Sequence, residues 1–470
     1  MVRPLLFLFG SLLTLTARAQ TPAYNFYYGN LHSHTSYSDG NQDEATSGAS
    51  TPADAYAFAD ASLQMDFLGV SEHNHSQAGM QRSNYALGLQ QAAQATNPQF
   101  VALFGMEWGV ISGGGHMLVY GVNQLLNWEA GNLDVFVPRN DYQALMRQIN
   151  RRPGAFALFA HPANLDYGDL AGAAPFSPTA DSAVVGTPLR SGPATSTNVT
   201  YSNNSTSSFE STYQRMLARG YHVGMGFDHD NHNTTFGRST AGRLVVLAPT
   251  LTQASIMQAM RERRFYGSDD WNVQVTLSCN GAPMGSILTS PAPAALSVTV
   301  SDPDNESIRS ITLMRGVPGS LVNAVSVATS TTGAAALSYT DPAPSGTAYY
   351  YAIIIQADGN RIVTSPIWYT RSAVVSAATV AANPLAFEVF PNPTPGTDVT
   401  ISYYLQHPAA VSLEVIDVLG RKVYALSQNE VQASGPKAYT LPATGLPAGI
   451  YTIRLTQDGV VTHRKLVVSY

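Results

Sequence analysis

The chain has 470 residues, a formal net charge of −6 and only 12% charged residues. This length exceeds what one hydrophobic core usually supports, so we expect two or three domains. The mild charge argues against a specific nucleic-acid partner. The single cysteine, Cys279, excludes an internal disulfide and any zinc site with two or more thiolates, so a metal must be held by histidine and carboxylate side chains.

Residues 1–19 have the pattern of an export signal. Arg3 supplies a positive charge, an apolar run covers residues 5–15, and Ala17-Arg-Ala19 provides small residues at the expected cleavage site. We therefore expect the mature chain to begin at Gln20. No later run approaches the roughly 20 apolar residues that a helix needs to span a bilayer, so we expect no integral membrane span.

Residues 20–270 alternate short apolar runs with amphipathic segments, which predicts an α/β barrel. The apolar runs end near a polar residue, as buried strands do, and cover residues 66–71, 101–107, 117–120 and 156–161. One helix is predicted to begin at Thr51-Pro52, and the others lie near residues 141–150, 208–219 and 252–264. The polar stretch at 172–208 is interpreted either as a loop that covers substrate or as an exposed insertion.

Helical periodicity ends after Trp271. Alternating runs divided by turn residues, such as 296–301 and 349–356, predict a β-sandwich over residues 271–371. We expect this domain to pack against the barrel, and binding of carbohydrate is the alternative. A linker at 372–385 leads to a second β-rich domain at 386–470.

Residue types that bind metals gather in the first half of the chain. His32 and His34 share one face of an extended segment, because strand side chains alternate, and Asp39 follows in a Ser-Asp-Gly turn. Further metal-binding types lie at or near the ends of predicted strands, where barrel enzymes place catalytic groups: His73, Glu107, His116 and His161. A buried carboxylate is costly unless it is ion-paired or bound to metal.

The last motif is the run Asp228-His-Asp-Asn-His232. Asp230 and His232 have a spacing that lets them bind neighbouring metals from one loop, whereas Asp228 followed by His229 is a rival register that the sequence leaves open. Two residues beside His73, Glu72 and His75, either support the ligands or are solvated. Arg238 and Arg243 either hold a substrate phosphate or are surface residues.

Taken in order, these motifs resemble the polymerase and histidinol phosphatase (PHP) superfamily over residues 26–270. The run Gly105-Met-Glu-Trp108 and the exit Phe265-Tyr-Gly-Ser-Asp269 resemble its CehA/McbA-like branch. The resemblance implies a distorted (β/α)7 barrel with two or three Zn, Mn or Fe ions. It assigns the first ion to His32, His34, Glu107 and the loop aspartate, the second to Glu107, His116 and His161, and the third to Asp39, His73 and His232. Glu72 departs from the superfamily, which usually has aspartate there.

Grouped cations lower the pKa of a bound water from 15.7 to about 7 and hold phosphoryl oxygens. We therefore predict a secreted metal-dependent phosphoesterase that hydrolyses a phosphate mono- or diester of a small molecule, with Glu107, Asp230 and His161 as catalytic residues. Hydrolysis of a carbamate, amide or other ester at the same metals is one alternative. A non-catalytic surface binding protein with structural metals is the other.

The C-terminal domain resembles the sorting domain of the type IX secretion system (Por). The resemblance covers residues 386–470 and rests on four motifs: Phe387-Glu-Val-Phe-Pro-Asn-Pro393, Val415-Ile-Asp-Val-Leu-Gly-Arg421, Leu446-Pro-Ala-Gly-Ile-Tyr451 and Lys465-Leu-Val-Val468. It implies an immunoglobulin-like β-sandwich, type IX secretion machinery as a partner, passage across the outer membrane, and release or surface attachment after processing.

Overall fold

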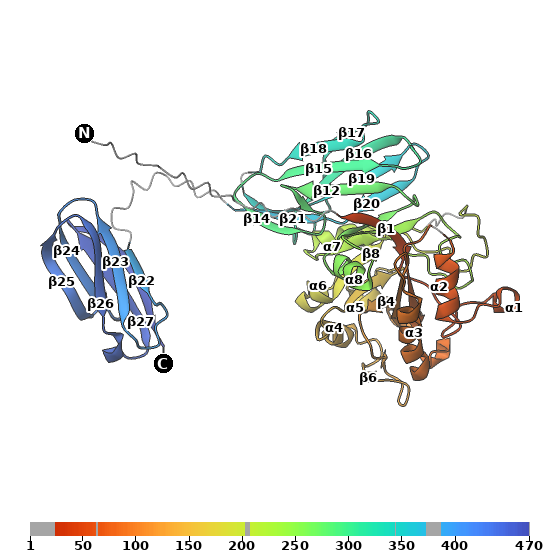
Figure 1. Cartoon of the computed structure of the whole chain (residues 1–470), viewed down its shortest axis with the longest axis horizontal. Coiled ribbons are helices and arrows are strands. Elements are labelled where there is room, and N and C mark those ends of the chain that lie inside the picture. The colour runs from red at the N-terminus through yellow and green to blue at the C-terminus, as the bar shows by residue number, and fades with distance from the viewer. Residues whose placement is uncertain (1–23, 63, 203–206, 344, 373–386, 470) are drawn as a thin grey trace, which may run out of the picture. The chain divides into compact units, whose positions relative to one another are not determined.

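The computed structural model describes residues 24–62, 64–202, 207–343, 345–372 and 387–469. The predicted export signal and nearly all of the predicted linker lie outside these residues. The chain divides into two compact units, Met1–Ala373 and Val374–Tyr470 (Figure 1). The regions 20–270 and 271–371, expected as separate domains, both belong to the first unit. Among the described residues, no helix is long and apolar enough to cross a membrane.

A 15-stranded mixed sheet runs through the first unit. Parallel pairing joins β1 (Asn25–Asn30) to β2 (Phe67–His73) and β2 to β3 (Val101–Val110). The next two pairings are antiparallel, from β3 to β4 (Gly115–Tyr120) and from β4 to β7 (Phe156–Ala160). Parallel pairing then adds β8 (Val184–Pro188) and β9 (Gly224–Gly226) at this end.

The other end of the same sheet extends into the second half of the unit. Antiparallel pairing joins β1 to β10 (Arg243–Ala248), β10 to β11 (Phe265–Ser268) and β11 to β20 (Arg361–Thr364). The remaining strands of this sheet are β19 (Gly346–Gln356), β21 (Ile367–Arg371), β14 (Ile287–Ser290), β16 (Ile308–Gly316) and β17 (Val325–Ser330). Hydrogen bonding along β11 and β20 therefore makes the two halves one body.

A four-stranded sheet faces these last strands and completes a β-sandwich. It consists of β13 (Ala282–Pro283), β12 (Gln274–Cys279), β15 (Ala295–Ser301) and β18 (Ala336–Thr340). Val298 and Ile354 lie in the core of this sandwich, together with Val245 of β10 and Tyr266 of β11. The sandwich therefore shares its core with strands of the first half.

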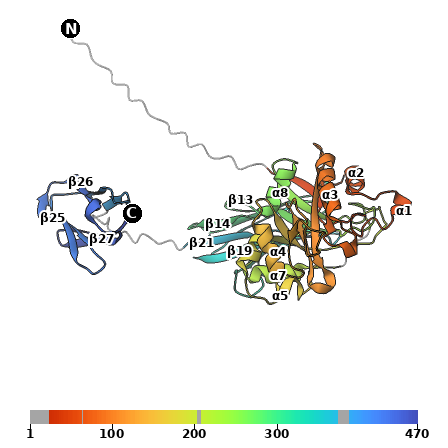
Figure 2. The same ribbon diagram turned by 90° about the horizontal axis from the view of Figure 1, so that it is seen from below.

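The helices lie around the strands of the first half, and α7 also packs against β19 of the sandwich (Figures 1 and 2). They are α1 (Glu44–Ser47), α2 (Pro52–Asp60), α3 (Arg82–Ala95), α4 (Tyr142–Asn150), α5 (Asp166–Asp169), α6 (Pro178–Ala183), α7 (Glu210–Ala218) and α8 (Gln253–Arg261). A capping box starts α2. The backbone N–H of Asp54 donates to the Thr51 hydroxyl, the backbone N–H of Thr51 donates to the Asp54 carboxylate, and Pro52 is the first residue of the helix. A small separate sheet pairs β5 (Leu126–Asn127) with β6 (Val135–Phe136).

The predicted distorted (β/α)7 barrel is wrong. Strands predominate over helices in the part of the chain that the structure describes, and the hydrogen-bonded order of the large sheet runs open from β9 to β14. Periodicity located buried strands but not their direction. A parallel connection needs about a dozen residues or more, whereas the short turn at Ile111–Gly113 joins β3 directly to β4, so the two strands run antiparallel.

The second unit consists of two sheets around a core of its own. One contains β22 (Phe387–Phe390), β23 (Val399–Leu405) and β26 (Gly435–Leu441). The other contains β25 (Lys422–Gln432), β24 (Ala409–Ile416), β27 (Gly449–Gln457) and β28 (Val460–Val468). Ile401 and Leu413 are fully buried between them.

Candidate metal centre

All nine predicted ligands lie together at one end of the first-half strands. His32 and His34 follow β1, and their segment is held in place where the backbone N–H of His34 donates to the carbonyl of Asn231 at 2.8 Å. Ser33 points the other way and donates to the carbonyl of Gly69, so alternation turns both imidazoles toward the same side. The other ligands come from the turn after this segment, from β2, β3 and β4, and from the loops after β7 and β9: Asp39, His73, Glu107, His116, His161, Asp230 and His232.

Glu107 is the centre of the cluster. Its carboxylate is 1% exposed and lies beside five histidine rings. The nitrogen to oxygen distances are 3.1 Å for His32, 3.1 Å for His34, 3.2 Å for His73, 3.0 Å for His116 and 3.1 Å for His161. One buried carboxylate therefore lies beside five histidines from four separate segments of the chain.

Two further carboxylates complete the cluster. Asp230 Oδ1 lies 3.1 Å from His32 Nε2 and 3.4 Å from His34 Nε2. Asp39 Oδ1 lies 3.6 Å from His73 Nε2 and 3.5 Å from Nε2 of His232.

Three overlapping sets of side chains have ligand atoms close enough to share an ion. They are His32, His34, Glu107 and Asp230; His73, Glu107 and His116; and His34, Asp39, His73 and His232. The first set equals the one that the family resemblance implies, with Asp230 as the loop aspartate. The second contains His73 where His161 was expected, and the third includes His34 as an additional member.

The donor atoms suit divalent cations better than hydrogen bonds. His32 Nε2, His34 Nε2, His73 Nδ1 and His116 Nδ1 are buried and make no hydrogen bond within the described residues, although each lies near a carboxylate oxygen. Two ligands that are each about 2.1 Å from one ion lie about 3.0–3.4 Å apart in octahedral or tetrahedral geometry, which is the spacing seen here. Imidazole with carboxylate suits Zn, Mn and Fe.

Electrostatics keep the buried carboxylates ionised. Burial would raise the pKa of Glu107, but His116, His32 and His73 outweigh it and hold this pKa well below its ordinary value. Burial would likewise lower the pKa of His34, yet Asp230 and Glu107 raise it to about 10. Glu107 and Asp230 are therefore ionised, as carboxylates that bind a metal must be.

The loop after β9 places Asp228 and Asp230 differently, although the sequence left open which of them is the ligand. Asp230 faces the ligands, whereas Asp228 lies behind His32, with its Oδ2 3.4 Å from Nδ1 of that ring. A carboxylate in this position fixes the tautomer and orientation of a ligating histidine. His229 is buried, with its Nε2 2.7 Å from the carbonyl of Gly242, so it has a structural contact instead.

Glu72 has a supporting position that sequence reasoning left undecided. It is fully buried and accepts a 3.0 Å hydrogen bond from the backbone N–H of Thr35, and it also bonds the hydroxyls of Thr35 and Ser38. These bonds hold the turn between His34 and Asp39. The sequence did contain a signal for this supporting role. An acidic residue stands directly before the predicted ligand His73, and two hydroxyl residues follow His34.

Neither candidate arginine presents a simple phosphate site. Arg243 is fully buried and donates to the carbonyls of Gly237, Thr240 and Gly242, which makes it structural. The guanidinium of Arg238 stacks on the ring of Phe58 at 4.6 Å.

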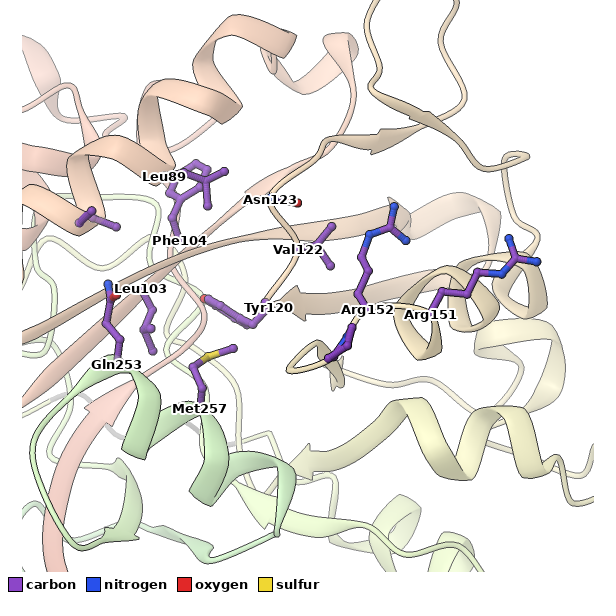
Figure 3. Close-up of a pocket in the computed structure, with 14 residues that line it drawn as sticks. Leu89, Leu103, Phe104, Tyr120, Val122, Asn123, Arg151, Arg152, Gln253 and Met257 are labelled. Carbon is purple, nitrogen blue, oxygen red and sulfur yellow. The ribbon is translucent and has the colours of Figure 1, made fainter.

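Solvent reaches only part of the cluster. His32 and His34 have fully buried side chains, whereas the side chains of His161 and Asp39 are 20% and 43% exposed. A separate cavity of about 520 Å³ lies near the opposite ends of β3 and β4, lined by Leu103, Phe104 and Tyr120 (Figure 3). Because the ligands Glu107 and His116 lie at the other ends of these strands, this cavity is distinct from the metal centre.

Residues 388–469 match the family model of the secretion system C-terminal sorting domain. The predicted sorting domain is therefore confirmed, and the chain is exported by type IX secretion to the cell surface or the extracellular space. A search of curated proteins found no match.

Several solved structures share weak similarity with the chain. The fibronectin(III)-like modules of CbhA from Clostridium thermocellum are 13% identical, over 41% of this chain and 94% of that one, with a TM-score of 0.16. The human OSCAR ligand-binding domain is 14% identical, over 41% and 97%, with a TM-score of 0.16. A tetra-tandem repeat of a large adhesion protein is 16% identical, over 44% and 56%, with a TM-score of 0.17. Such scores assign neither a fold nor an activity.

Proposed function

We propose that the first unit is a metal-dependent phosphoesterase, secreted by the type IX route, that hydrolyses a phosphate mono- or diester of a small molecule. The observation that carries the proposal is the convergence of five histidines on the buried carboxylate of Glu107, with Asp230 and Asp39 completing three overlapping ligand sets. The order of these motifs, which resembles the PHP superfamily, supports a phosphate ester as the substrate. The proposal rests on the ligands and does not require a barrel.

The residues have distinct tasks in this site. When bound, divalent cations supply a water of lowered pKa and neutralise the oxygens of a phosphoryl group. Glu107, His32 and His34 form the buried floor and exclude water from the protein side of the cations. His161 and Asp230 lie at the side that substrate can reach, where their side chains are 20% and 17% exposed.

Backbone conformation supports a functional role for the same two residues. His161 has a φ of 32° and Asp230 a φ of 53°. Both values lie in the left-handed region, which residues other than glycine rarely adopt. Such strain persists where the surrounding structure enforces it and gathers at functional sites.

The test is turnover of chromogenic phosphomonoester and phosphodiester substrates by the full chain after metal removal and after return of Mn²⁺ or Zn²⁺. We expect metal-dependent turnover that is lost in Glu107→Gln and His32→Ala. Matched controls are Glu262→Gln, an exposed glutamate after α8, and His222→Ala, whose ring bonds Asp181. Both controls should retain turnover.

Three outcomes would contradict the proposal. Turnover only of a carbamate, amide or carboxylic ester would replace the phosphoesterase with another hydrolase of the same site. Stoichiometric metal without turnover of any of these substrates would favour a binding protein with structural metals. Equal turnover in the cluster variants and the controls would place the activity elsewhere.

A further inference from the structure

A second group of acidic side chains lies at the junction between the first-half strands and the sandwich. Asp270 follows β11, whereas Asp302 and Glu306 belong to the loop between β15 and β16. Their carboxylate oxygens lie within 4.8 Å of one another. Asp270 is 3% exposed, so one member of the group is a buried carboxylate.

Short hydrogen bonds hold these carboxylates in place but leave acceptor capacity. Asp270 Oδ1 accepts from the backbone N–H groups of Asn272 and Val273 at 2.8 Å and 2.7 Å. Asp302 Oδ1 accepts from the N–H of Asp304 at 2.8 Å. Because both backbone bonds to Asp270 converge on one oxygen, its other oxygen remains available as a ligand.

Two buried amide oxygens beside the group have no hydrogen-bond partner. Gln356 is fully buried and donates from Nε2 to Asp302 Oδ2 at 2.6 Å, while its Oε1 is unpaired in the described structure. Asn272 is 6% exposed and donates from Nδ2 to Asp304 Oδ2 at 2.9 Å, while its Oδ1 is unpaired in the same way. The Gln356 amide therefore reaches the acidic group, and the Asn272 amide reaches the neighbouring Asp304. Each brings an unsatisfied buried oxygen with it, which normally costs stability.

No lysine or arginine of the described residues forms an ion pair with this group. Within the described residues, none of Asp270, Asp302, Asp304 and Glu306 has a lysine or arginine nitrogen within 4.0 Å. Burial and the surrounding aspartates, Asp358 foremost, raise the pKa of Glu306 to about 7. The group therefore combines like charges with unpaired oxygens, and the histidines of the metal centre take no part in it.

We propose that Asp270, Asp302 and Glu306, with the amide oxygens of Gln356 and Asn272, bind a Ca²⁺ ion that fastens the sandwich to the first-half strands. Ca²⁺ takes six to eight oxygen ligands from carboxylates, amides and water, and this donor set contains oxygen alone. Extracellular calcium sites commonly have Kd values of about 10⁻⁴–10⁻³ M, which suits an exported chain. The ion would join the exit of β11 to the end of β19 and the loop after β15.

The first test is calorimetric melting of the full chain, dialysed into calcium-free buffer and then given Ca²⁺. At about 10 mM Ca²⁺ we expect the Tm of the first unit to rise by about 2–4 °C. The double variant Asp302→Asn/Glu306→Gln should lose this rise. Its Tm without calcium serves as its own baseline, because Asp302→Asn removes a repelling charge but also one of the two hydrogen bonds that Asp302 accepts.

A second measurement reads the site directly. The indole N–H of Trp271 donates to Asp304 at 3.1 Å, so Tb³⁺ bound in place of Ca²⁺ should luminesce on excitation of tryptophan. Ca²⁺ should compete this signal away, and Glu306→Gln, which changes a single exposed side chain, should weaken Tb³⁺ binding at least tenfold.

Controls separate this site from the metal centre. Glu262→Gln and His34→Ala should keep both the calcium-induced rise in Tm and the Tb³⁺ signal, whether or not the phosphoesterase proposal holds. A Tm that does not respond to Ca²⁺, or a response that survives in the double variant, would overturn the proposal. Loss of the response in His34→Ala would assign it to the metal centre and would overturn it equally.

Discussion

Replacement of Asp228 by asparagine should weaken metal binding without touching a ligand. Asp228 Oδ2 lies 3.4 Å from His32 Nδ1, and the opposite nitrogen, Nε2, faces Glu107 and Asp230 at 3.1 Å. The side chain of Asp228 is 6% exposed and that of His32 fully buried, so water cannot take the place of the lost charge. Asparagine keeps the shape but neither holds a negative charge beside the ring nor imposes one tautomer on it.

The expected loss follows from this geometry. Partners that orient a metal-binding histidine typically change metal affinity or activity by about 10–100-fold when they are replaced. This range corresponds to about 1.4–2.7 kcal/mol of binding free energy. We expect the loss in the ion whose ligands include His32, while ions held by the other histidines keep their affinity.

Competition with a chromogenic chelator measures the affinity, and turnover of the phosphate esters measures the consequence for activity. Asp181→Asn is the matched control, because Asp181 bonds Nδ1 of His222 at 2.9 Å in the same unit but outside the cluster. Equal metal affinities for Asp228→Asn, Asp181→Asn and the unaltered chain would refute the positioning role of Asp228.

Three further predictions concern stability. Removal of bound metal should lower the Tm of the first unit, whose buried carboxylates then repel one another, and leave the second unit unchanged, which calorimetry can separate. Thr51→Ala removes the cap of α2 and should cost about 1 kcal/mol of unfolding free energy, measured by denaturant titration against Thr46→Ala in the short helix α1. Burial would raise the pKa of Asp341, but bonds from Tyr350, Ala343 and Arg315 lower it, so its contribution is present above about pH 4 and is lost as pH falls through the lower folded pKa. The unfolding free energies of Asp341→Asn and the unaltered chain should therefore differ at pH 7 and converge in acid; a constant difference would contradict this reasoning.

Local features of the chain predicted much of what the structure contains. The capping residue Thr51 with Pro52 located α2, and apolar runs located β2, β3 and β7. Secretion by the type IX route was predicted from motifs in residues 386–470 and is confirmed by the family match. These features are readable because capping, periodicity and short motifs depend on neighbours in the sequence.

The barrel was predicted wrongly for a physical reason. Periodicity reports that a strand is buried, but not which strand it pairs with or in which direction. Strand partners and strand directions are determined by the short turn between β3 and β4 and by the pairing of β11 with β20. Together they produce an open mixed sheet that continues into the sandwich.

The sequence by itself determined which residue types could hold metals, because imidazole and carboxylate chemistry and the His32-x-His34 alternation are local properties. Tertiary structure alone decided how these residues are shared. It placed Glu107 among five histidines, turned Asp230 toward His32 and His34 and Asp228 toward the back of His32, and brought the amide nitrogen of Gln356 to Asp302. Such contacts join residues far apart in the chain, so only the packing of strands and loops in space can bring them together.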